Sequence, residues 1–391
     1  MTELRPLLIA NALCVSAMMA FVAVVGPLVR ALGLAEWHGG LAVTLAGVLW
    51  MLLARPWGRA SDRYGRKPIL LLSMGGFALA YLLLAVVLDI ALYLSLGVVV
   101  TVTLLSLSRS LIGAFYAAVP PASAALIADR FPRETRTSAM ASLGAANAIG
   151  MVLGPLLGGM LASWSLTLPL YMAAVLPLLA VVLLWRFLPA TEPRSAASAA
   201  PPRLFDPRLR LPLASALLAM GTVVTAQTCI GFFALDRLNL DGASAARVAG
   251  SAMACVGVML IAVQVAVMRF RSVAPEVWLT SGALVAATGF GAVTQVSASL
   301  GLIVSYGIAA AGMGLVFPAF QALAANAVSA TEQGHAAGSV SAVQGLAIVI
   351  APLASAALYG MNPTLPYGVC AVLLLVLALS GGLAMRRRFS G

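Results

Sequence analysis

The sequence predicts an all-α membrane protein of 12 transmembrane helices, built as two pseudo-symmetric six-helix bundles. Its 391 residues are 62% hydrophobic and 9% charged, with a mean hydropathy of +1.04. Soluble domains are about 45–50% apolar and about 25% charged. The apolar residues form twelve long runs, and a stretch rich in Pro, Ala, Ser and Arg divides these runs six and six. This composition excludes a soluble enzyme, a disordered chain and a small disulfide-stabilised domain.

Each apolar run is long enough to cross a bilayer, which takes about 20 residues. The runs lie at residues 6–29, 39–57, 68–88, 92–128, 138–161, 168–188, 212–234, 247–268, 276–297, 300–326, 336–359 and 366–385. Continuous apolarity, rather than alternation, predicts helices, because a helix satisfies its own backbone in lipid. The run at 92–128 is too long for one straight span, so we expect a helix with an extension there.

The basic residues predict the orientation of the chain. With the N-terminus inside, 19 of the 23 Arg and Lys residues fall on the cytoplasmic side and three, Arg30, Arg237 and Arg247, on the other. Cytoplasmic loops carry the excess of Arg and Lys, so we expect both termini in the cytoplasm of a bacterial cell, with the protein in the inner membrane. The net charge of +11 is therefore interpreted as a topology signal rather than a nucleic-acid-binding surface.

The chain is predicted to consist of two halves joined by a linker. Residues 1–188 form the N-terminal bundle, 189–211 the cytoplasmic linker and 212–391 the C-terminal bundle. Two proline pairs repeat at the same separation, because Pro318 follows Pro121, and Pro352 follows Pro155, by 197 residues. Halves of equal orientation are related by an axis along the membrane normal, with the substrate site between them.

The loop after the second run carries the motif Gly58-Arg-Ala-Ser-Asp62-Arg63-Tyr-Gly65-Arg66-Lys67. The two glycines are expected to allow a tight turn and close backbone approach. Asp62 can cap a helix or pair with an arginine. A loop that only sets topology would explain the basic residues, but not the spacing of Gly and Asp.

This motif resembles the signature loop of the major facilitator superfamily, of the form GxxxDRxGRR/K. The resemblance implies that Asp62 and Arg66 form a cytoplasmic gate that breaks and reforms during alternating access. It also implies that Asp129, at the end of the fourth span, faces Arg66 across that gate. The resemblance covers essentially the whole chain and extends to drug:proton antiporters with twelve helices.

The fifth span carries Gly150-Met-Val-Leu-Gly154-Pro155-Leu-Leu-Gly158-Gly159. Glycines four residues apart leave one helix face bare for a neighbouring helix, and Pro155 removes a backbone hydrogen bond and kinks the helix. GxxxG alone is common in spans. The longer pattern resembles the antiporter motif of the family, which marks exporters and is generally missing from uptake symporters.

Arg109 is the one basic residue inside a span, where it is costly and a functional candidate. With Gly113 it resembles a family motif linked to proton transfer; snorkelling to the outer interface is the alternative. No acidic residue lies clearly in mid-membrane, so Glu36 and Asp236, at outer ends of spans, are the nearest proton-coupling candidates. The alternative is that both are surface-loop residues without a role in proton coupling.

Polar and adaptable side chains on spans that line the cavity of this fold are the substrate-binding candidates. They are Asn11, Met18, Tyr116, Asn147, Gln227, Phe232, Gln321 and Gln344. Helix–helix hydrogen bonds and core packing are equally good explanations of these residues.

The predicted function is secondary active export of small molecules, coupled to protons. Because Arg109 has no buried acid beside it, we expect an anionic or zwitterionic substrate such as a siderophore, a metallophore or an organic acid. A broad-specificity multidrug pump is the alternative, and an uptake symporter or a non-transport membrane sensor is less favoured. We expect no enzyme activity, cofactor, metal site or nucleic-acid partner, and a monomer in the lipid bilayer. No Walker-type phosphate loop is present that would indicate ATP hydrolysis.

Overall fold

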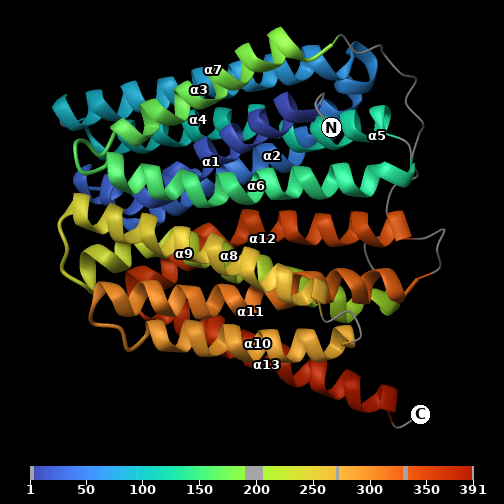
Figure 1. The fold of residues 1–391 in the computed structure, drawn as a ribbon. Helices are drawn as coiled ribbons and strands as arrows, with labels where there is room; N and C mark the ends of the chain where they lie inside the picture. The colour runs from blue at the N-terminus through green and yellow to red at the C-terminus, as the bar shows by residue number, and fades with distance from the viewer. Residues whose placement is uncertain are drawn as a thin grey trace. The chain divides into compact units, whose positions relative to one another are not determined.

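The computed structural model describes residues 4–94, 96–131, 133–189, 206–269, 273–328 and 333–389, which are almost entirely helical. No strand occurs among these residues. In chain order the elements are α1 Arg5–Ala31, α2 Glu36–Tyr64, α3 Arg66–Leu94, α4 Val98–Tyr116, α5 Val119–Arg130, α6 Arg133–Leu161, α7 Leu168–Phe187, η2 Pro207–Leu209, α8 Arg210–Asp236, α9 Gly242–Arg269, α10 Pro275–Val293, α11 Ser299–Asn326, α12 Gln333–Met361 and α13 Leu365–Phe389 (Figure 1).

Twelve of the described segments are long and apolar enough to cross a membrane, which confirms the predicted fold class. α4 and α5 together make one of these segments, Val98–Arg130. Large apolar side chains are exposed along them, including Leu79, Val99, Leu300 and Leu379, each at least 64% exposed. An apolar surface of this extent fits a chain surrounded by lipid.

The long run at 92–128 is divided because two consecutive prolines follow its first helix. Pro120 and Pro121 have no N–H, so the carbonyls of Tyr116 and Ala117 lose their helical partners, and α4 ends at Tyr116. Both prolines fit the first turn of α5, where an N–H would be unsatisfied anyway. In α11, which has Phe317 before Pro318, the helix stays continuous.

The described residues form two compact units. One comprises those within Met1–Ser198 and Asn239–Ala254, and the other those within Ala199–Leu238 and Cys255–Gly391. The predicted boundaries at 188 and 212 stay a prediction, since most of the linker (190–205) lies outside the described residues.

Inside the first unit, α1 packs against α6 and α7, while α4 packs against α2 and α3. In the second unit, α10 packs against α11 and α13, and α8 against α12 (Figure 1). α1 is the most buried helix of the first unit, and small residues such as Ala10, Ala17 and Ala20 are fully buried along it. Small side chains let helix backbones approach closely, which is how spans associate where lipid is as apolar as the protein.

Candidate functional site

The turn between α2 and α3 depends on Gly65. This residue has φ +94° and ψ 155°, a conformation that L side chains rarely adopt, and α3 starts at the next residue. The expected turn role of Gly58 is wrong: it lies inside α2, and nothing is within 4 Å of where its Cβ would be. α2 continues for six residues beyond Gly58, so one glycine makes the turn.

Arg66, immediately after the turn, binds two carboxylates and a hydroxyl. Its side chain contacts Asp62 Oδ1 at 2.5 Å and Asp129 Oδ2 at 2.9 Å, and donates to Ser61 Oγ at 3.0 Å. Arg66 is only 9% exposed. The predicted proximity of Asp129 to Arg66 is therefore present. Because Arg66 has two carboxylate partners, the loss of one still leaves its charge paired with the other.

Lys67 and Arg130, the neighbours of Arg66 and Asp129, hold the end of α7. Lys67 Nζ donates to the carbonyls of Trp185 (2.9 Å) and Leu188 (2.5 Å), and Arg130 Nη2 donates to that of Pro189 (3.3 Å). The last carbonyls of a helix lack partners and carry partial negative charge, so cations stabilise them. Sequence reasoning missed this contact, because nothing in the motif indicates which helix end lies nearby.

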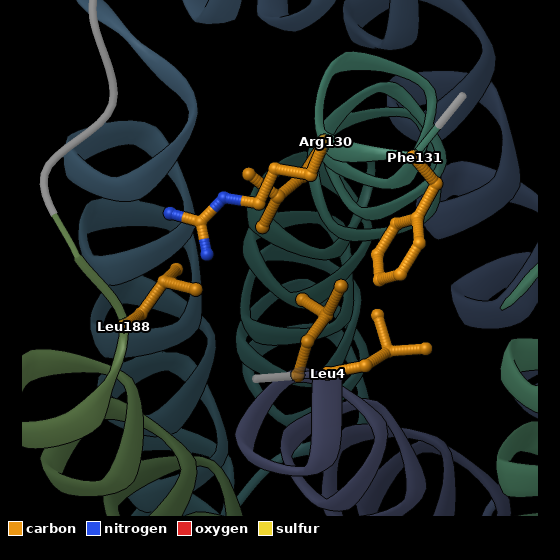
Figure 2. A pocket seen from close by; sticks show the side chains of 6 residues that line it. Leu4, Arg130, Phe131 and Leu188 are labelled. Carbon is orange, nitrogen blue, oxygen red and sulfur yellow. The ribbon is translucent and has the colours of Figure 1, made fainter. Parts of the chain in front are cut away.

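A small hollow lies beside this contact, with room for no more than about one water molecule, and its lining residues are Leu4, Leu7, Leu126, Arg130, Phe131 and Leu188. Figure 2 shows the Arg130 side chain extending toward Leu188, with the Phe131 ring and Leu4 on the other side. The hollow is apolar apart from Arg130, and none of the predicted substrate-binding residues lines it.

The glycines of α6 meet the backbone of α1. A Cβ on Gly150 would lie 2.6 Å from Ala12 O, one on Gly154 2.4 Å from Ser16 O, and one on Gly158 2.8 Å from Ala20 O. Carbon atoms in ordinary contact with such atoms are 3.4–4 Å away. The predicted bare face is thus occupied by α1, and α6 is assigned as one helix through Pro155.

A second face of α6 is equally bare, which the sequence did not indicate. A Cβ on Gly250 of α9 would lie 2.3 Å from Pro155 O, and one on Gly159 would lie 2.6 Å from Ala246 O. Gly250 and Ala246 lie within Asn239–Ala254, which belongs to the first unit. α6 is therefore packed through bare backbone on two sides.

Arg109 of α4 is buried, with 3% of its surface exposed. Its guanidinium carbon lies 4.1 Å from the centre of the Phe21 ring, and Nη1 donates to Tyr81 Oη at 3.5 Å. No carboxylate in the described part of the chain pairs with it. Snorkelling to the outer interface is therefore wrong for this structure, in which the Arg109 side chain lies against Phe21 of α1 and Tyr81 of α3. Tyr81 and Phe21 were missed because only helix register brings them to Arg109.

Glu36 and Asp236 both lie at helix ends and have partners. Glu36 starts α2 and forms an ion pair with Arg30. Asp236 ends α8, is exposed, and accepts a hydrogen bond of 3.0 Å from Tyr359. Neither is placed inside a bundle, so their proton-coupling role stays a prediction.

The substrate-binding candidates differ in exposure. Asn11, Tyr116 and Phe232 are buried within their own units, and Asn11 donates to Leu7 O and Ser123 Oγ at 2.9 Å. The two hydrogen bonds account for Asn11 as helix packing, and the burial of Tyr116 and Phe232 fits the same role. Gln321 is exposed, and the remaining four, Met18, Asn147, Gln227 and Gln344, are half-buried. Among these, Asn147 has a buried Oδ1 without a hydrogen-bond partner.

The described residues form two units with membrane-spanning helices, with the ion pairs of Arg66 between α2, α3 and α5 and bare glycine faces along α6, an arrangement that fits a membrane transporter. The chain belongs to the Major Facilitator Superfamily, whose family model matches residues 7–352. It is a multi-pass membrane transporter.

Tetracycline resistance proteins are among the proteins to which this chain is similar. The class G protein of Vibrio anguillarum is 29% identical over 343 residues, which is 82% of this chain and 80% of that protein. The class C protein of Escherichia coli is 26% identical over 83% of this chain and 81% of its own length. The class H protein of Pasteurella multocida is 33% identical, but only over 41% of this chain and 36% of its own length.

Solved structures support the fold. A bacterial homologue of the human lysosomal transporter Spinster, in an inward-facing and occupied conformation, has a TM-score of 0.76 at 16% identity, covering 98% of this chain and 96% of that one. The human organic anion transporter MFSD10 has a TM-score of 0.67 at 20% identity, covering 96% and 98%. Similarity at this level of identity concerns the fold alone.

Proposed function

We propose that this protein exports small molecules across the bacterial inner membrane by alternating access, in exchange for protons. The observation that carries the proposal is the α6 seam, in which Gly150, Gly154 and Gly158 lie directly on the backbone of α1. The pattern around Pro155 resembles the antiporter motif, and the seam supplies a physical reason for that pattern. The tetracycline resistance proteins that match over about four fifths of this chain support export as the direction of transport.

The Arg66 network is the proposed cytoplasmic gate. Arg66 is held by Asp62 on α2 and by Asp129 on α5, so a movement that separates these helices must break at least one ion pair. Carboxylates that are partly exposed to water can exchange a protein partner for water at a lower cost than fully buried ones. Asp62 and Asp129 are 29% and 27% exposed at the side chain, and therefore meet this condition.

The proposed substrate is a small molecule with an acidic group, either anionic or zwitterionic, such as a siderophore, metallophore or organic acid. Arg109 supports this, because it is a buried cation without a carboxylate partner in the described residues. A multidrug pump is the second candidate, and the matches to tetracycline resistance proteins favour it. Glu36 and Asp236 remain the proposed proton-coupling residues.

The test is export from inside-out membrane vesicles of a bacterial strain without its own pumps. A pH gradient, acidic inside, should drive uptake of tetracycline or the carboxylate drug nalidixic acid into these vesicles, and a protonophore should abolish it. Vesicles that contain the Asp62→Asn variant at the same protein level as the wild type serve as the control. Drug accumulation that does not depend on the pH gradient, or that occurs in right-side-out vesicles and not in inside-out ones, would refute proton-coupled export.

Ethidium separates the two substrate classes. If nalidixic acid is exported and ethidium is not, the acidic-substrate proposal holds. Strong ethidium export that survives replacement of Arg109 would instead identify a multidrug pump.

A further inference from the structure

Two buried hydrogen-bond donors on α4 have no partner. They are Ser106 Oγ and Arg109 Nε, and the two residues are 7% and 3% exposed. Residues three apart lie on the same face of a helix, so Ser106 and Arg109 share one face of α4. Most buried polar atoms in proteins are hydrogen-bonded, and an exception calls for an explanation.

The surroundings of Arg109 leave its guanidinium largely unused. A guanidinium has five N–H donors and no acceptor. Its one hydrogen bond to protein, to Tyr81 Oη, has a length of 3.5 Å, at the outer limit for such a bond. Phe21, 4.1 Å away, offers its ring face, which attracts the cation but accepts no ordinary hydrogen bond.

In the second half of the chain, the side chain at the corresponding position makes its hydrogen bonds to protein. Tyr306 follows Arg109 by 197 residues, the same separation as the proline pairs. Its hydroxyl donates to Ala226 O at 2.9 Å and lies 2.8 Å from Tyr367 Oη. The fold can therefore supply partners at this position of the repeat, and within the part of the chain that the structure describes the buried donors without partners lie in the first half.

We propose that Ser106 and Arg109 form a binding site for a carboxylate group, which the exported substrate supplies. A carboxylate accepts hydrogen bonds on both oxygens and matches the fork of a guanidinium, so one group satisfies both donors. Phe21 gives the site an apolar wall for the body of a hydrophobic acid. This assignment rests on the proposed function, and it places the acidic group of the substrate at α4.

The experiment is thermal unfolding of the purified full-length protein in detergent, followed by the fluorescence of its six tryptophans. Sodium benzoate replaces sodium chloride stepwise at constant ionic strength, and benzamide is the uncharged analogue. Benzoate should raise the Tm of the wild type in a saturable way, and benzamide should not. Arg109→Gln should lose the rise. Ser106→Ala should weaken apparent benzoate binding about tenfold, the effect of one hydrogen bond to a charged group.

Arg186→Gln is the matched control, because Arg186 is exposed at the end of α7 and lies over Phe187. It should respond to benzoate as the wild type does. Ser106→Ala removes a single oxygen, so it keeps the test valid if Arg109→Gln fails to fold. Three results would overturn the site. They are a benzoate-dependent rise of Tm in both variants as large as in the wild type, the same rise with benzamide, and no rise in the wild type.

The outcome is separable from that of the transport assay. Export driven by the pH gradient without any Arg109-dependent benzoate response refutes the carboxylate site and leaves the exporter. Benzoate binding that requires Arg109, in a protein that moves no substrate outward, supports the site and refutes export.

Discussion

Replacement of Gly154 by alanine measures how closely α6 depends on its contact with α1. The added Cβ would lie 2.4 Å from Ser16 O and 2.9 Å from Ser16 Cα. Both are backbone atoms inside a helix, so neither can rotate away. To reach the 3.4 Å at which ordinary contact begins, the two helices must separate by roughly 1 Å at this point.

Gly144, in the same helix, provides the matched control. It is exposed, and nothing lies within 4 Å of its Cβ position. Gly144→Ala should stabilise the protein by about 0.8–1.0 kcal/mol, because alanine is the better helix former. Gly154→Ala has the same gain in helix propensity, but the added methyl group overpacks the contact with α1. This overpacking lowers the unfolding free energy by about 1–3 kcal/mol. We therefore expect the unfolding free energies of the two variants to differ by about 1–3 kcal/mol.

The measurement is unfolding of both variants in mixed detergent micelles, with export in vesicles measured on the same preparations. Gly154→Ala should unfold more readily than Gly144→Ala and export more slowly, while Gly144→Ala should export like the wild type. Equal unfolding free energies and equal export rates would refute the argument that bare backbone at Gly154 is required.

Three further predictions concern charged groups. Asp62→Asn should slow export several-fold and leave helical content by circular dichroism intact, because Arg66 keeps its other partners; unchanged export would count against the gate. Lys67→Gln should make the end of α7 more sensitive to protease, by loss of charge-assisted bonds to two carbonyls, and equal digestion of both proteins would contradict this. At the start of α9, hydrogen bonds from Ser244 lower the pKa of Asp241. Protection of the first α9 amides from hydrogen exchange should therefore hold above the usual aspartate range and fade as pH falls through the lowered pKa, whereas pH-independent protection would show that Asp241 does not hold the helix start.

Much of the gate could be predicted because its residues are close in sequence or belong to a recognised motif. Asp62 and Arg66 are four residues apart, and Asp129 entered through the family resemblance. Gly58 was misplaced because the motif spans a helix end, and its letters do not say at which residue α2 stops. Gly65, with its positive φ, is where the chain turns.

The substrate candidates show the opposite case. Asn11 and Tyr116 were chosen because polar atoms are unusual in spans, yet each is buried among neighbouring helices. A polar residue in a span has to meet a partner, and whether the partner is protein or ligand depends on helix packing. Asn147 and Arg109 remain with unused polar atoms, which no pattern of letters could distinguish from the satisfied ones.

The sequence by itself determined that this chain has twelve segments able to span a membrane, and it predicted that the halves repeat and that Arg109 lies deep within a span. These properties depend on local hydrophobicity, on charge counts and on spacing along the chain, all of which are present in the letters. Only the tertiary structure decided which backbone each glycine of α6 meets, and that Arg109 Nε and Ser106 Oγ lack hydrogen-bond partners. Such contacts depend on the register and separation of helices far apart in sequence, where a shift of about one residue, or 1.5 Å, exchanges one neighbour for another.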